Sequence, residues 1–159
     1  MDLNRIVTSG AFLRRSRLGT VGEHRCRHAA GMTSRVTQIE HRVAAARAAI
    51  ENLRPDELAD ELADSGGRLV LVDVRSAGEH RSGAIKGSIN VPRGTIELEL
   101  ARIADPRCRV VVYCDTGRRS ALAAATLYEI GYEDVAHLDG GLAAWRHAGH
   151  PLTRFSSQG

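Results

Sequence analysis

The fold is decided by the stretch Cys-Arg-Val-Val-Val-Tyr-Cys-Asp-Thr-Gly-Arg-Arg-Ser-Ala, residues 108–121. An apolar run stops at Cys114, a small polar turn follows, and an Ala- and Leu-rich segment with helical spacing begins. This order predicts a strand, a tight loop and a helix, with a thiol where the strand ends. Sites of parallel α/β sheets are built at the carboxyl ends of strands, and the positive end of a following helix lowers the pKa of a thiol placed there. We therefore expect Cys114 to be a catalytic nucleophile.

Short apolar runs alternate with helical patterns along the rest of the chain. Alternation of this kind is typical of an α/β fold, with a parallel sheet, helices on both faces and right-handed crossovers. An N-terminal helix is expected over 36–53, with a short edge strand at 50–54 as the alternative. The other expected elements are strands at 69–74, 88–91, 109–113 and 135–138, helices at 55–65, 95–104 and 120–130, and a last helix containing Leu142 and Trp145.

One domain accounts for most of the chain. It is expected over 54–153, after a disordered leader at 1–35 and the N-terminal helix, and before a flexible tail at 154–159. The leader is rich in arginine, and two interpretations of it stay open. It is either an organelle transit peptide or sequence upstream of a translation start at Met32.

Charge and composition exclude several classes of protein. The net charge is +3, but the first 31 residues hold six arginines against two acidic residues, so the rest does not indicate a nucleic-acid partner. No apolar run is long enough to cross a membrane. Three cysteines are too few for a disulfide scaffold, which favours a reducing, cytoplasmic compartment. His24, Cys26 and His28 lie close together without a second ligand pair, so neither a metal nor another cofactor is expected.

Four segments, in order, resemble the signatures of the single-domain rhodanese family of sulfurtransferases. They are 71–80, 83–92, 113–120 and 131–145. One departure is Ala84, where the family often has histidine, and we expect a local packing change there. The resemblance implies a rhodanese-like three-layer fold with a five-stranded parallel sheet. It also implies that the nucleophilic cysteine takes the outer sulfur of thiosulfate or a similar donor as a persulfide and passes it to cyanide or a thiol.

The loop after Cys114 has residues that suit such an intermediate. A persulfide is anionic at neutral pH, and a short curled loop brings several backbone N–H groups toward it. Gly117 permits a kink with positive φ, and Arg118 and Arg119 supply positive charge for a dianionic donor. Asp115 opposes this charge, so we expect it to point away or to pair with an arginine. The expected substrate-binding residues are Asp115, Thr116, Gly117, Arg118, Arg119 and Ser120.

Three residues outside the loop are expected to support it. Asp73 is expected to cap or hydrogen-bond near the loop rather than act as a general base. Arg75 and Glu79 are expected to form a half-buried ion pair. We assign His80 to the surface or to a hinge, since no third group completes a triad. Cys108 is expected to be an inert strand residue.

Two other functions stay open. A phosphatase or arsenate reductase also uses a cysteine at a strand end, but its loop needs an arginine six residues after the nucleophile. Position 120 is a serine here, and Arg119 comes one residue early. The other alternative is a rhodanese module that carries sulfur for a protein partner or serves as an interaction domain.

Overall fold

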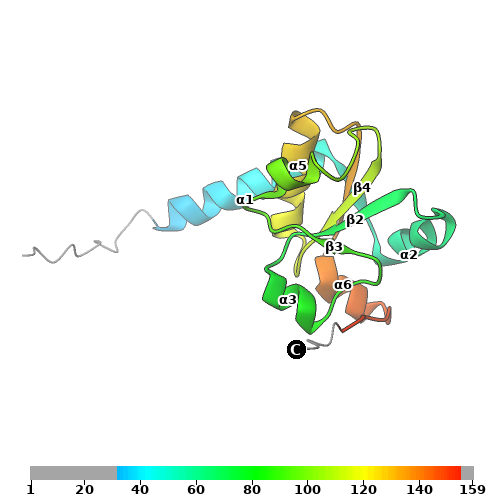
Figure 1. The fold of residues 1–159 in the computed structure, drawn as a ribbon. Helices are drawn as coiled ribbons and strands as arrows, with labels where there is room; N and C mark the ends of the chain where they lie inside the picture. Colours follow the sequence, from blue (N-terminus) through cyan, green and yellow to red (C-terminus); the bar gives the residue numbers. More distant parts are fainter. Residues whose placement is uncertain (1–31, 155–159) are drawn as a thin grey trace, which may run out of the picture.

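A sheet of five short strands positions the candidate site within the residues that the structure describes. The computed structural model of the chain describes residues 32–154 (Figure 1). The strands are β1 (Glu51–Leu53), β2 (Leu69–Asp73), β3 (Ile89–Asn90), β4 (Arg109–Tyr113) and β5 (Asp134–Leu138). They lie in the order β1-β5-β4-β2-β3, and every neighbouring pair is parallel. The predicted five-stranded parallel sheet is confirmed.

The helices in the described residues are α1 (Met32–Ala49), α2 (Pro55–Asp64), α3 (Ala77–Ser82), α4 (Ile96–Leu100), α5 (Arg118–Glu129) and α6 (Gly141–His147). They cover both faces of the sheet, as predicted, because its central strands are apolar on both sides. In β4, Val110 and Val112 pack with α4 and α5, whereas Val111 and Tyr113 pack with α2 and α6. Figure 1 shows the resulting three layers, with α5 on one side of the sheet and α6 on the other.

The N-terminal helix ends earlier than predicted. α1 stops at Ala49, and residues 51–53 form β1, which pairs with β5. The edge-strand alternative is therefore the correct one for this segment. Asn52 accounts for the ending, since its side-chain amide donates to the carbonyls of Arg47 and Ile50, each at 2.9 Å. β5 has a free edge whose backbone N–H and C=O groups can pair with a further strand. The helical pattern of the sequence contains no information about this pairing.

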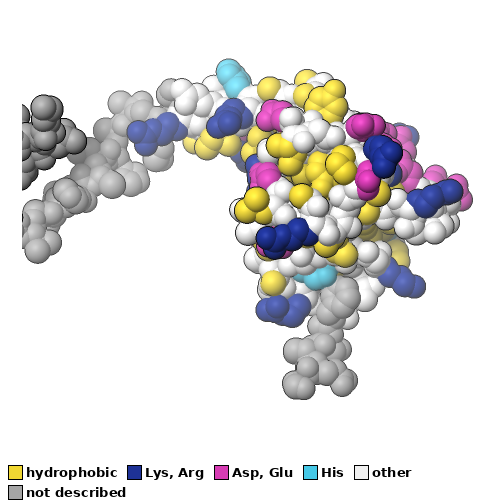
Figure 2. Space-filling model, turned by 45° about the horizontal axis from the view of Figure 1, so that its top comes forward, with side chains coloured by type: hydrophobic (Ala, Val, Ile, Leu, Met, Phe, Trp, Pro, Cys, Tyr) yellow, Lys and Arg dark blue, Asp and Glu magenta, His cyan; other side chains and the backbone are white. Residues whose placement is uncertain are grey.

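The predicted leader is also shortened by the structure. Residues 32–35, which the sequence assigns to the leader, are helical and belong to α1. Residues 1–31, on which both interpretations of the leader rest, lie outside the described residues, as do residues 155–159 of the predicted tail. α1 projects from the body of the molecule in Figures 1 and 2, while its C-terminal half buries Val43 and Ala46.

Two elements near the candidate site differ from their predicted bounds. The connection at 75–86 contains α3, which opens with a capping box between Ser76 and Glu79. α5 begins at Arg118 rather than at residue 120, directly after Gly117. Among the described residues, no helix is both long and apolar enough to span a membrane.

Candidate active site

Cys114 lies directly after β4, at the carboxyl edge of the sheet and just before α5. Its exposed fraction is 1%, so the residue is shielded from bulk solvent. Gly117 is the N-cap residue of α5, and the positive φ predicted for it is confirmed at 82°. A Cβ on Gly117 would lie 3.0 Å from the backbone nitrogen of Gly140. The loop is thus packed closely against the turn that precedes α6.

The N-terminus of α6 fixes the direction of two carbonyl groups of the loop. The N–H of Leu142 donates to the Cys114 carbonyl at 2.8 Å, and that of Ala143 donates to the Asp115 carbonyl at 2.9 Å. In the described part of the chain, the backbone N–H groups of residues 115–120 have no such partner. Unpaired donors of this kind collect in the first turn of any helix and suit an anion. Their convergence on the Cys114 sulfur stays a prediction.

Arg118 and Arg119 lie at the start of α5, and each pairs with a carboxylate from another helix. Arg118 forms an ion pair with Glu40 of α1, and the Arg119 guanidinium lies 2.9 Å from the Glu79 carboxylate of α3. The four side chains are between 39% and 50% exposed. The hydrogen bond to Glu79 raises the pKa of Arg119, with a smaller contribution from Cys114. Arg119 lies in the first turn of α5, the helix that begins just after the Cys114 loop.

Glu79 is held in place by the start of its own helix. Its carboxylate accepts hydrogen bonds from the Ser76 N–H at 2.9 Å and from the Ser76 hydroxyl at 2.7 Å. Arg119 and Ser76 together lower the pKa of Glu79 to about 2. The carboxylate therefore stays ionised near neutral pH. The predicted ion pair between Arg75 and Glu79 is wrong, since Glu79 pairs with Arg119 instead.

Arg75 pairs with Asp73 in a buried network beneath α3. The Arg75 guanidinium donates to both carboxylate oxygens of Asp73, at 2.7–3.1 Å, and to the carbonyl of Gly83 at 2.7 Å. His80 Nδ1 lies 3.0 Å from the same carboxylate and the His80 side chain is 13% exposed, so its assignment to the surface is wrong. Asp73 forms hydrogen bonds, as expected, but its carboxylate accepts them from Arg75 and lies beside His80 rather than bonding to the loop at 114–120. The network joins β2 to α3, the helix that carries Glu79.

His137 is a buried residue behind the loop that sequence reasoning missed. Its Nε2 lies 2.7 Å from Asn52 Oδ1, and its Nδ1 lies 3.4 Å from Ser120 Oγ. Because the Asn52 amide nitrogen donates to two carbonyls, Oδ1 faces His137 and accepts from its Nε2–H. Burial lowers the pKa of His137 to about 4, and nearby Arg47 adds to this effect. A histidine between two apolar residues of β5, Ala136 and Leu138, is the one signal that could have pointed to it.

The remaining loop residues are placed differently from one another. Thr116 is exposed and Asp115 is half-buried. Within the described residues Asp115 forms no ion pair with Arg118 or Arg119, both of which pair elsewhere. Ser120 is fully buried, and its hydroxyl donates to the Gly117 carbonyl at 3.2 Å, so its side chain supports the loop from within. Contact of these residues with a substrate stays a prediction.

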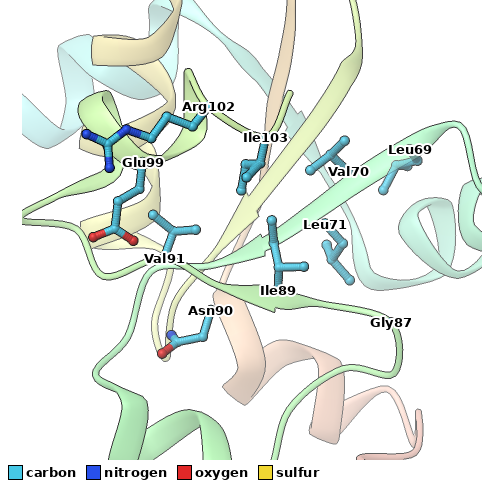
Figure 3. Close-up of a pocket in the computed structure, with 10 residues that line it drawn as sticks. All are labelled: Leu69, Val70, Leu71, Gly87, Ile89, Asn90, Val91, Glu99, Arg102 and Ile103. Carbon is cyan, nitrogen blue, oxygen red and sulfur yellow. The ribbon is translucent and has the colours of Figure 1, made fainter. Parts of the chain in front are cut away.

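A hollow beside the edge strand β3 is separate from this loop. It lies between β2, β3 and α4 and is lined mainly by apolar side chains, among them Leu71, Ile89 and Ile103 (Figure 3). No residue of 114–120 contributes to it. The described part of the chain also holds no group of three His, Cys, Asp or Glu side chains arranged to bind a metal ion.

Comparison with known proteins shows the family. Residues 54–148 match the family model of the rhodanese-like domain, and the chain therefore belongs to the rhodanese-like family. A sulfurtransferase of Allochromatium vinosum is 34% identical over 103 residues, which cover 65% of this chain and 94% of that protein. The thiosulfate sulfurtransferase GlpE of Pseudomonas fluorescens is 38% identical over 92 residues, 58% of this chain and 82% of that protein. Both of these relatives are described as sulfurtransferases.

Other relatives are longer or carry different descriptions. The probable adenylyltransferase/sulfurtransferase MoeZ of Mycobacterium tuberculosis is 41% identical over 58% of this chain, which spans only 24% of that protein. The polysulfide-sulfur transferase homodimer of Wolinella succinogenes has a TM-score of 0.67 at 30% identity, over 82% of this chain and 97% of that one. A Rhodopseudomonas palustris protein described as a possible tyrosine phosphatase has a TM-score of 0.66 at 35% identity, over 72% of this chain and 93% of that one.

Proposed function

We propose that the protein is a sulfurtransferase in which Cys114 carries the transferred sulfur as a persulfide. The Cys114 thiolate attacks the outer sulfur of a donor such as thiosulfate, the donor's S–S bond breaks, and sulfite leaves with the electron pair. Cyanide or a thiol then attacks the outer sulfur of the persulfide and regenerates the thiolate. The observation that carries this proposal is the position of Cys114 at the end of β4, beside the unpaired N–H groups of residues 115–120.

Each part of the site has a place in this cycle. The loop N–H groups and Arg119 stabilise negative charge on the donor and on the persulfide. Burial of Cys114 keeps bulk water away from the persulfide. Asp73 and Arg75 hold α3, and α3 brings Glu79 to Arg119. Cys108 and Cys114 are both free thiols, which fits a reducing compartment such as the cytoplasm.

Intact mass measurement tests the proposal. The purified protein incubated with thiosulfate is expected to gain about 32 Da, one sulfur atom, and to lose it again on addition of cyanide or a thiol. Cys114→Ser should show no gain, because the nucleophile is absent. Cys108→Ser is the matched control and should load as the wild type does, since Cys108 lies at the other end of β4. A sulfur adduct that persists in Cys114→Ser would refute the assignment.

The mass measurement, together with an assay of aryl phosphate hydrolysis, separates the alternatives. A protein that loads sulfur but releases it to neither cyanide nor a thiol would be a carrier for a specific protein acceptor. A protein that hydrolyses an aryl phosphate and does not load sulfur would be a phosphatase. We expect no phosphatase activity, because Ser120 occupies the position that such a loop gives to arginine and its hydroxyl is turned to Gly117.

A further inference from the structure

Each arginine of the candidate site faces a carboxylate that comes from outside the loop. Glu40 of α1 pairs with Arg118, and Glu79 of α3 pairs with Arg119. Asp115 adds a further acidic group on the loop itself. Together these five side chains carry three negative charges and two positive ones. The positive charge that Arg118 and Arg119 give the loop in the sequence is therefore balanced by carboxylates in the structure.

This balance works against a doubly charged donor. A dianion that approaches the Arg119 guanidinium also meets the Glu79 carboxylate 2.9 Å from it, so attraction and repulsion largely cancel. The donor must also compete with that carboxylate for the guanidinium N–H groups. The Coulomb part of this cost is proportional to the donor's charge. Water and salt screen exposed pairs and reduce the cost, but they do not change its sign.

We propose that Glu40 and Glu79 are specificity-determining residues that favour sulfane-sulfur donors with at most one negative charge over the thiosulfate dianion. Organic thiosulfonates are donors of this class, as are organic persulfides through the minor fraction that is protonated at neutral pH. The proposal rests on the proposed sulfur transfer at Cys114 and narrows its donor. It also gives α1 a role in donor choice, although α1 lies outside the residues 54–148 that match the family.

The chemistry balances for such a donor. With a thiosulfonate, R–SO₂–S⁻, the Cys114 thiolate attacks the outer sulfur and a new S–S bond forms. The S–S bond of the donor breaks, and the sulfinate R–SO₂⁻ leaves with the electron pair. With a protonated persulfide, R–S–SH, the leaving group is R–S⁻ and the proton stays on the transferred sulfur. Neither step needs an external oxidant or reductant.

The test compares thiosulfate with methanethiosulfonate, which present the same sulfane sulfur with two and one negative charges. kcat/KM is measured with each donor, and with cyanide as acceptor, for the wild type, Glu40→Gln and Glu79→Gln. Glutamine keeps the size of the side chain and can preserve the capping box of α3. We expect each substitution to raise kcat/KM about fivefold for thiosulfate and about twofold for methanethiosulfonate, because the electrostatic free energy scales with donor charge.

Glu129→Gln is the matched control for the change in net charge. Glu129 is exposed at the far end of α5, about 16 Å along the helix from Arg118. Glu129→Gln should leave kcat/KM unchanged for both donors. The inference is overturned if Glu40→Gln and Glu79→Gln change kcat/KM by the same factor for the two donors. It is also overturned if they change kcat/KM no more than Glu129→Gln does. If neither donor loads sulfur on Cys114, the proposed sulfur transfer itself fails, which is a different result.

Discussion

The His137 side chain gives the folded protein a specific response to acid. Its ring is fully buried, and burial is the main reason why its pKa is lowered to about 4. The ordinary histidine pKa of about 6.5 applies to the unfolded chain. Between these two values the unfolded state binds more protons than the folded state, so stability falls as the pH falls through this window. At about 1.4 kcal/mol for each pKa unit, we expect a loss of about 3 kcal/mol near pH 4.

Urea unfolding at a series of pH values measures this effect. The free energy of unfolding should fall more steeply between pH 6.5 and pH 4 for the wild type than for His137→Gln, because glutamine does not titrate. Glu79 has a folded-state pKa of about 2 and loses its contribution only below about pH 4.5, in both proteins. Equal slopes would contradict the prediction. A direct NMR titration of His137 in the wild type should show no protonation above pH 5, even if the variant does not fold.

At the scale of single residues, the sequence predicts local relations better than distant ones. The roles expected for Cys114 and Gly117 depend on a strand end and a tight turn, which neighbouring residues define. The partner of Arg118 lies 78 residues away along the chain, and that of Arg119 lies 40 residues away. No periodicity carries that information, because only the packing of α1 and α3 beside the loop brings the carboxylates there. The basic character of the loop was overestimated for this reason.

At the scale of elements, the start of α6 fits beneath the Cys114 loop only because its first residue, Gly141, is a glycine. Gly141 has a φ of 60°, and a Cβ there would lie 2.5 Å from the Cys114 carbonyl oxygen and 2.7 Å from the Gly117 nitrogen. Backbone atoms cannot rotate away as a side chain can, so either the loop or α6 must shift. We expect Gly141→Ala to lower kcat/KM for sulfur transfer about 10- to 100-fold, because the loop amides leave their positions.

Gly149→Ala is the control for backbone strain in that experiment. Gly149 also has positive φ, at 84°, but a Cβ on it meets nothing within 4 Å. It should lose about 1–2 kcal/mol of stability, as a non-glycine residue does in the left-handed region, and keep its kcat/KM. Kinetics at 25 °C and urea unfolding of both variants separate the two effects. Full activity in Gly141→Ala, or an equal loss of kcat/KM in both variants, would refute this account of the contact between α6 and the Cys114 loop.

Element length decides how much of the fold the sequence predicts. Each of β2, β4 and β5 has five residues, at least three of them apolar, and α5 has 12 residues of clear periodicity. β1 has three residues and α3 has six, too few to establish a period. β1 exists because β5 has an edge to pair with, and α3 because Ser76 and Glu79 cap it. The pairing of β1 with β5 is a contact that no pattern in the sequence contains, whereas Ser76 and Glu79 have the spacing of a capping box, which the sequence does show.

At the scale of the whole molecule, the two ends of the sheet have different roles. The carboxyl ends of the parallel strands meet near Cys114, whereas the amino end of β4 lies about 17 Å away at 3.3 Å per residue. At that end Arg109 pairs with Glu51 of β1, Glu61 of α2 and Asp134 of β5, at 2.6–2.8 Å. Its side chain is 19% exposed. Arg109 thus ties the short edge strand to the rest of the sheet, far from the candidate site.

Arg109→Met should therefore lower stability and leave sulfur transfer intact. The substitution keeps the apolar stem but leaves three carboxylates close together, and we expect a loss of about 2 kcal/mol in the free energy of unfolding, larger at low salt than at high salt. Arg107→Met is the matched control, since Arg107 is 77% exposed and its one ion pair with residues of 32–154 is to Asp105; the substitution should cost less than about 0.5 kcal/mol. Urea unfolding measures the change in stability, and kcat/KM at 25 °C measures sulfur transfer. If kcat/KM falls although the Arg109→Met protein is folded, the two ends of the sheet are coupled and this separation of roles is wrong.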